Sequence, residues 1–172
     1  MAYHFTMLDL PPELAEWRNS LRNAFDVVEH QRFLDAAESY SFHLNIAGVG
    51  LCRRRMAELG MLAGGTPAPF PEYPSWNRSL YSSEAEHRAA NKKVWEEYAD
   101  NELSASSQRG QGLGIPRFKL ESNGPWIVVE EEVRAALAAL DRSDPAISVQ
   151  GADVWTTWVA WLRRASSGFE VS

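Results

Sequence analysis

Few residues in this chain of 172 are of the types that usually carry out chemistry. Histidine is the side chain that most often acts as a general base or metal ligand near neutral pH. The chain has four histidines, at His4, His30, His43 and His87. No two of them have the spacing that places both imidazoles on one helix face, as a helical zinc site needs. Glu84 and His87 form a single Glu-x-x-His motif, whereas di-iron helix bundles contain two such motifs. We therefore predict no metal and no cofactor.

Cys52 is the only cysteine, so no disulfide can form within the chain and a cytoplasmic location is the natural expectation. His43 could act as its base, with Asn45 orienting the imidazole ring. If both residues lie on one helix, however, nine residues separate them by about 13 Å along the axis. A buried, unreactive Cys52 is the simpler interpretation. No catalytic residue is predicted.

The stretch SFHLNIAGVGLCRRRMAELG, residues 41–60, contains two glycines followed by three arginines. A dinucleotide-binding loop would need a third glycine where Arg53 stands, and no Gly-Lys-Ser or Gly-Lys-Thr sequence occurs. Apolar residues keep helical spacing through the glycines, and Gly60 suits the position after a helix end. We predict a helix over 45–59 that a short strand could precede. The alternative is an anion site formed by Gly50 and one arginine.

Residues 63–82, AGGTPAPFPEYPSWNRSLYS, combine four prolines with four aromatic rings. The rings belong to Phe70, Tyr73, Trp76 and Tyr81. A loop of this length without regular structure is often functional or disordered, and the aromatic content argues against disorder. Two interpretations remain open: the loop folds back over the protein's own core, or it presents the rings to a partner.

The clearest helix is predicted over SSEAEHRAANKKVWEEYADNEL, where Ser83 and Glu86 form a capping box. Its second half is acidic. The acids of this half are Glu96, Glu97, Asp100 and Glu102. They could contact a cationic partner, or they could simply face solvent. The Ser/Gly/Gln-rich residues 103–114 predict a flexible loop.

The two ends of the chain differ in pattern. Near the N-terminus the spacing of apolar residues predicts an amphipathic helix, and a second helical stretch after it could be continuous with the first. The apolar face of the first helix comprises Leu14, Trp17, Leu21, Phe25 and Val28. In the C-terminal third, the pattern predicts a hairpin about Ser122-Asn123-Gly124, followed by a helix that starts with three glutamates. A further helix is predicted to be capped by Asp153 and to bury Trp155, Trp158 and Leu162. The last predicted element is a strand, FEVS.

These elements predict an α+β fold. We expect one helix-rich domain over 1–172, with about five helices and a small antiparallel sheet made by the C-terminal hairpin and the terminal strand. The hydrophobic fraction of 45% and charged fraction of 23% are typical of globular proteins.

Charge and hydropathy limit the partners. Lys and Arg total 17 against 23 Asp and Glu, a net charge of -6, and general nucleic-acid binding needs a cationic surface instead. No apolar run reaches the length that spans a membrane, and the first residues lack the features of a signal peptide. We expect a protein partner, no membrane and no nucleic acid, and leave the oligomeric state open.

Two segments carry a resemblance. These segments resemble a pattern found in small uncharacterised proteins of high-GC actinobacteria and their phages. The first is GIPRFKLESNGPWIVVEEEVRAAL with the following Trp-rich helix and ASSGFEV, and the second is FHLNIAGVGLCRRRMAELGML. The turn in that pattern more often reads Asn-Asp-Gly-Trp, whereas this chain has Asn123-Gly124-Pro125-Trp126. The resemblance implies a bacterial cytoplasmic context and assigns no activity or site residue.

The leading functional hypothesis is a protein-binding module, such as an inhibitor, immunity or anti-defence factor. Its predicted contacts are Phe70, Tyr73, Trp76 and Tyr81, with Glu96, Glu97, Asp100 and Glu102 as an acidic rim. The alternative is an enzyme or small-ligand binder with a site beside a tryptophan-lined pocket. Its polar groups would be His43, Arg53, Arg54 and His87.

Overall fold

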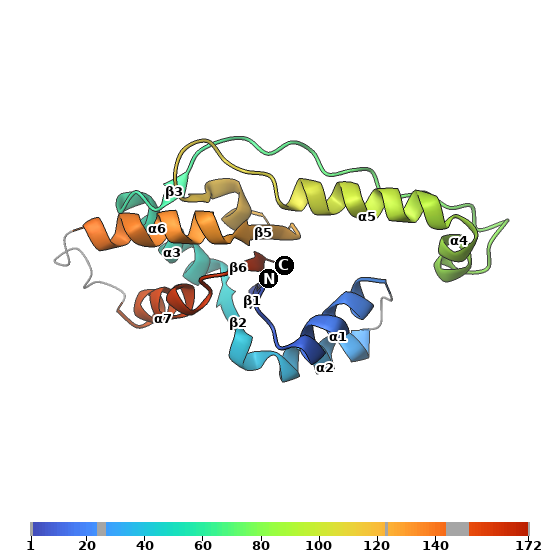
Figure 1. Cartoon of the computed structure of the whole chain (residues 1–172), viewed down its shortest axis with the longest axis horizontal. Helices are drawn as coiled ribbons and strands as arrows, with labels where there is room; N and C mark the ends of the chain where they lie inside the picture. The colour runs from blue at the N-terminus through green and yellow to red at the C-terminus, as the bar shows by residue number, and fades with distance from the viewer. Residues whose placement is uncertain (1, 24–26, 123, 144–151, 172) are drawn as a thin grey trace. The chain divides into compact units, whose positions relative to one another are not determined.

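The computed structural model describes residues 2–23, 27–122, 124–143 and 152–171 (Figure 1). The chain forms two compact units. Unit 1 comprises Met1–Thr66 and Arg109–Ser172, and unit 2 comprises Pro67–Gln108. The single domain expected over 1–172 stays a prediction.

Unit 1 is built on a four-stranded antiparallel sheet with the strand order β2-β1-β6-β5. The strands are β1 (Ala2–Met7), β2 (Ser41–Asn45), β5 (Trp126–Val129) and β6 (Gly168–Val171). The first and last strands of the chain are neighbours, with Phe5 opposite Val171. The small antiparallel sheet of the predicted α+β fold is thus confirmed, but its strands come from both termini and the middle of the chain.

The predicted C-terminal hairpin is wrong. The first of its two runs forms the two-residue strand β4 (Ile115–Pro116) and then a 3₁₀ turn, η2 (Arg117–Leu120). Strand β4 pairs in parallel with β3 (Leu62–Ala63), whereas β5 pairs with β6. The 3₁₀ turn buries Phe118, Lys119 and Leu120 together, which an alternating strand cannot do. The terminal strand joins β5, as predicted.

One face of the sheet carries the main core. Figure 1 shows α3 (Ile46–Glu58), α6 (Glu130–Arg142) and α7 (Ala152–Arg164) on this side. Trp158 of α7 contacts Phe5 and Phe169 of the sheet, with ring centroids 5.0 and 6.1 Å apart. Trp155, Trp158 and Leu162 are buried, as predicted. The expected cap residue, Asp153, is instead the second residue of α7.

Helices α1 (Pro12–Asn23) and α2 (Val27–Ala36) lie on the other side of the sheet (Figure 1). Leu14, Trp17 and Leu21 pack against a small cluster around Phe33, which confirms that part of the predicted apolar face. Val28 is 61% exposed, so it does not belong to this face. Phe25 lies outside the described residues. Together with α4 and α5 of unit 2, the described residues form seven α-helices, where about five were expected.

Helix α3 confirms the interpretation of residues 45–59. The Asn45 side chain accepts a 2.8 Å hydrogen bond from the Gly48 amide and so caps the helix start. At the other end Gly60 has φ 67°, and the Met61 amide donates to the Met56 carbonyl at 2.8 Å, which closes a Schellman motif. Strand β2 comes directly before α3.

Unit 2 contains two helices, α4 (Glu84–Ala90) and α5 (Lys92–Ser106), preceded by residues 67–83 without helix or strand. Ser83 caps α4, as predicted. The predicted single helix is interrupted at Asn91, whose φ of -120° is not helical. Helix α5 continues to Ser106, into the loop expected over 103–114. No helix in the described parts of the chain is long and apolar enough to cross a membrane.

Candidate functional site

Aromatic rings pack against one another in unit 2. We name it the aromatic cluster: Tyr73, Trp76, Tyr81, His87, Trp95 and Tyr98. The ring of Tyr73 lies 5.2 Å from that of Trp95 and 5.4 Å from that of Tyr98, both edge to face. Tyr81 contacts the ring of His87 at 4.9 Å. Rings of the segment predicted as the 63–82 loop therefore pack on α4 and α5, and a role of these rings in binding a partner stays a prediction.

Arg88 is bound within this cluster. Its guanidinium lies 4.0 Å above the centre of the Trp95 ring and donates to the Glu84 carboxylate at 2.7 Å and to the Tyr73 hydroxyl at 3.1 Å. Tyr73 in turn donates to Glu84 at 2.8 Å. This bond lowers the pKa of Glu84, and burial together with the same bond raises the pKa of Tyr73. The network fixes α4 against the preceding segment.

His87 is buried, and its Nδ1 accepts a 3.3 Å hydrogen bond from the indole N–H of Trp95. The imidazole therefore joins α4 to α5 and uses one of its two nitrogens inside unit 2. This places His87 in the interior of the small unit.

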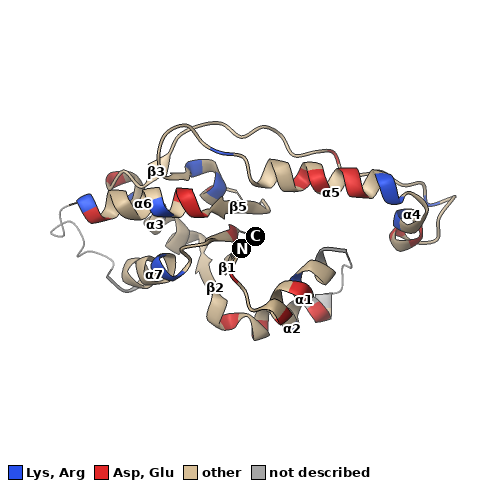
Figure 2. Ribbon diagram, in the orientation of Figure 1, with Lys and Arg blue, Asp and Glu red and all other residues tan. Residues whose placement is uncertain are grey.

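Several positions along α5 are acidic (Figure 2). Glu96, Glu97 and Asp100 are exposed, and the exposed Leu103 lies one turn beyond Asp100. Glu102 differs from the other predicted acids because it is half-buried and accepts a 2.9 Å hydrogen bond from the Tyr98 hydroxyl. Burial, together with this bond, raises the pKa of Tyr98 to about 12. Three of the four predicted rim acids therefore face solvent.

In unit 1 the second face of the sheet carries polar side chains from distant parts of the sequence. His4 of β1 is directly opposite His43 of β2, and their ring centroids are 4.3 Å apart. On the same face Glu170 of β6 forms an ion pair with Arg18 of α1 at 3.8 Å. Sequence reasoning missed this arrangement because it missed β1, although AYHFTM alternates apolar and polar residues from Tyr3 to Thr6 as a half-buried strand does.

The pairing of His43 with Cys52 does not form. His43 lies on β2 and is exposed, whereas Cys52 lies on α3 and is buried. Burial raises the pKa of the Cys52 thiol to about 12, so the thiolate is disfavoured. Cys52 is a core residue, as the simpler interpretation had it.

The three arginines of α3 point in different directions. Arg53 donates to the Leu120 carbonyl at 3.3 Å, Arg54 is exposed, and Arg55 pairs with Glu58 at 3.3 Å. Of the residues chosen for the ligand-binding alternative, His43, Arg53 and Arg54 lie in unit 1, and His87 lies in unit 2. The structure thus supplies no shared anion site for the arginines among the described residues.

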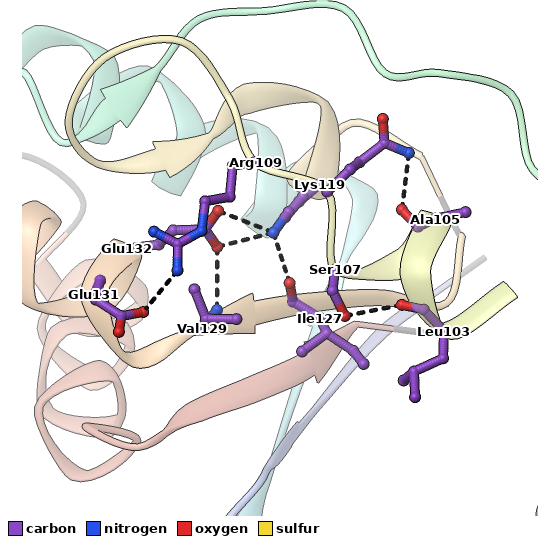
Figure 3. Close-up of polar contacts among 10 residues, drawn as sticks. Leu103, Ala105, Ser107, Arg109, Lys119, Ile127, Val129, Glu131 and Glu132 are labelled. Atoms are coloured by element: carbon purple, nitrogen blue, oxygen red, sulfur yellow. Dashed lines mark hydrogen bonds and ion pairs between the residues drawn. The ribbon is translucent and has the colours of Figure 1, made fainter. Parts of the chain in front are cut away.

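Unit 1 also contains a buried ion pair that sequence reasoning missed (Figure 3). The Lys119 ammonium donates to both carboxylate oxygens of Glu132, at 3.0 and 2.9 Å, and to the Ile127 carbonyl at 2.6 Å. Glu132 also accepts from the Val129 amide at 3.1 Å, so it caps α6. Burial lowers the pKa of Lys119, and Glu132 opposes this effect. All three protons of the ammonium are used, which makes the pair structural rather than catalytic.

Within the described residues no group of three or more His, Cys, Asp or Glu side chains could hold a metal ion. Comparison of the chain with protein-family models, curated proteins and solved structures gave no match. Two surfaces of the described residues are candidates for binding: the acidic face of α5 in unit 2 and the polar face of the sheet in unit 1.

Proposed function

We propose that the protein is a protein-binding module and that unit 2 carries its contact surface. The observation that carries the proposal is the outward face of α5, where Glu96 and Asp100 lie one helical turn apart and the exposed Leu103 follows one turn later. A partner that covers Leu103 would remove its apolar side chain from water, and the carboxylates beside it would form the polar rim of the contact. Leu80 of the same unit is 71% exposed.

The aromatic cluster supports this surface by fixing the inner face of α5. Trp95 and Tyr98 point inward, where Tyr73 and the guanidinium of Arg88 pack on them. A helix held in this way loses little freedom when a partner binds, so the entropy lost at the interface is small.

The chemistry of the surface indicates the class of partner. Carboxylates around an apolar side chain suit a partner segment with lysine or arginine beside an apolar residue. The net charge of -6 would also speed the approach of a basic protein. An inhibitor, immunity or anti-defence factor in a bacterial cytoplasm is a protein of this kind, consistent with the resemblance described above.

The aromatic residues predicted as contacts have different exposures. Tyr73 is 52% exposed and remains a predicted contact. Trp76 and Tyr81 are half-buried and lie against the His87 ring, and Phe70 is half-buried as well. We therefore expect their replacement to loosen unit 2 in addition to any effect on binding, which makes them poor residues for a test.

The ligand-binding alternative has less support. Arg53 already donates to the Leu120 carbonyl, and the Nδ1 atom of His87 accepts from Trp95. These polar groups are used by the protein itself rather than directed at a common point.

The test uses the triple variant Glu96→Gln, Glu97→Gln, Asp100→Asn in the full chain. The wild-type protein, purified gently from its host, is expected to carry a protein partner in native mass spectrometry, and the variant is expected to lose it. Because all three side chains are exposed, the melting temperature should stay within about 2 °C.

A matched control removes three exposed acids from α6, by Glu130→Gln, Glu131→Gln and Asp141→Asn. It changes the net charge by the same amount and should keep the partner. Equal retention by both variants, equal loss from both, or a wild-type protein that carries no partner would each contradict the proposal.

A further inference from the structure

The two edges of the sheet in unit 1 differ in how the chain covers them. Strands β5 and β2 lie at the two ends of the order β2-β1-β6-β5. At the β5 edge the Ile127 carbonyl accepts from the Lys119 ammonium at 2.6 Å (Figure 3). The Val129 amide donates to the Glu132 carboxylate at 3.1 Å. The buried ion pair therefore also closes this edge of the sheet.

At the β2 edge the hydrogen-bond pattern fixes which backbone groups point outward. In an antiparallel pair, residues that exchange bonds with the neighbouring strand alternate with residues whose N–H and C=O point away from it. Just after β1, the Leu8 amide donates to the Gly168 carbonyl of β6 at 3.0 Å, so the odd-numbered residues of β1 bond to β2. These odd positions are opposite even positions of β2. The outward residues of β2 are therefore Ser41, His43 and Asn45.

Some of these outward groups are already used within the chain. The Ser41 amide donates to the Glu38 carbonyl, and Asn45, as the N-cap of α3, uses its carbonyl for the first bond of that helix. The Ser41 carbonyl, both backbone groups of His43 and the Asn45 amide have no hydrogen-bond partner among the described residues. The sequence of β2, SFHLN, also lacks the charged residues and prolines that commonly block an open edge.

We propose that this edge binds a second copy of the chain, with the two β2 strands antiparallel about a two-fold axis at His43. In this register His43 exchanges both backbone bonds with His43 of the second copy, and the Asn45 amide of each copy donates to the Ser41 carbonyl of the other. Every available group is then paired, and none of the groups already used is needed. A longer strand of another protein would meet the occupied Ser41 amide and Asn45 carbonyl at its ends, so the self-match is the better fit.

The same register joins apolar side chains on the core face of the sheet. Phe42 lies opposite Leu44 of the second copy, at a closely spaced position of the ladder. In the single chain Phe42 is half-buried against Trp158 and Trp161, with ring centroids 5.7 Å away in both cases. The second copy would cover more of this ring, and the two four-stranded sheets would form one continuous sheet. This contact lies in unit 1 and does not depend on the partner proposed for α5.

The first measurement is sedimentation velocity of the untagged full-length protein over a range of concentrations, in which we expect a reversible dimer. His43→Pro removes one outward donor from each copy, and proline is tolerated where the N–H of an edge strand faces solvent. It should weaken the dimer by more than about tenfold. His43→Lys, which places like charges opposite each other, should also weaken it. The matched control His43→Gln keeps the backbone donor and a neutral side chain, and it should dimerise as the wild type does.

Hydrogen exchange followed by NMR tests the register. The amides of His43 and Asn45 should gain protection as the protein concentration rises, whereas those of Phe42 and Leu44, which bond to β1, should be protected at every concentration. Far-UV circular dichroism checks that each variant is folded. A wild type that stays monomeric, a dimer that survives both His43→Pro and His43→Lys, or an equal loss in His43→Gln would overturn the proposal. Protection of the His43 amide only when another protein binds would assign the edge to that protein and would overturn it too.

Discussion

Each unit contains a cation paired with a carboxylate, and the two pairs differ in burial. Lys119 and Glu132 of unit 1 have side chains that are 0% and 7% exposed, whereas Arg88 and Glu84 of unit 2 are 30% and 39% exposed. The buried pair uses every proton of the ammonium, and Glu132 also caps a helix. In the half-exposed pair, the guanidinium of Arg88 instead lies over the ring of Trp95. That ring also contacts the ring of Tyr73 edge to face.

The difference shows how each unit is held together. Unit 1 has a sheet and a large aromatic core, so it can bury an ion pair at which its 3₁₀ turn, a strand and a helix meet. Unit 2 is small and has little apolar area to bury, so it depends on contacts among rings and partly solvated charges. Loss of the buried Lys119 charge in unit 1 should therefore be severe, and loss of the partly exposed Arg88 charge in unit 2 should be mild.

The largest expected effect is that of Lys119→Met. The change leaves the Glu132 carboxylate buried without its cation, and we expect a loss of about 3–5 kcal/mol in the free energy of unfolding, measured by urea denaturation with far-UV circular dichroism. Adding Glu132→Gln should restore part of the loss, because the remaining side chain is neutral and can still accept from the Val129 amide.

Arg134→Met on α6 serves as the control, since Arg134 forms an exposed pair with Glu130 at 3.6 Å. It should change the stability by less than about 0.5 kcal/mol. If Lys119→Met costs no more than this control, the burial of the pair is wrong and the contrast between the units fails.

A smaller effect is expected for Arg88→Met. The exposed ion pair and the contact with the Trp95 ring together should contribute about 1 kcal/mol. Hydrogen exchange should show faster opening of α4 and α5 while the amides of the sheet in unit 1 keep their protection. Lys92→Met, which affects only the exposed pair with Glu96, should leave these rates unchanged. Faster exchange in the sheet would mean that the two units do not open independently.

The smallest effect is a dependence on alkaline pH that comes from Tyr98. Its pKa is raised from 10.0 to about 12, so between these values the folded state holds a proton that the unfolded state has lost. Its contribution to stability is complete below pH 10 and falls as the pH rises toward 12. Urea unfolding followed by tryptophan fluorescence at pH 9 and pH 11 should show a smaller decline in Tyr98→Phe than in the wild type. An identical decline would exclude the contribution of Tyr98.

Candidate sites were harder to predict from sequence than helices. The acidic run on α5 was visible because its acids follow one another closely along a predicted helix, although Glu102 turned inward to Tyr98. The Lys119–Glu132 pair was not visible, because Glu132 suits a helix start equally well without any partner. The histidine pair was hidden for another reason: His4 and His43 are neighbours only through the pairing of β1 with β2.

The sequence by itself determined the local features: the helix after Asn45, its end at Gly60, the capped start at Ser83 and the apolar face of α7. Each depends on residues within one or two helical turns, where hydrogen bonds and side-chain spacing are set by near neighbours. Only the tertiary structure decided the place of β1, the replacement of the hairpin by a 3₁₀ turn, and the partners of His4 and Lys119. Strand pairing joins residues far apart in the chain, and its register depends on the whole core rather than on any short segment.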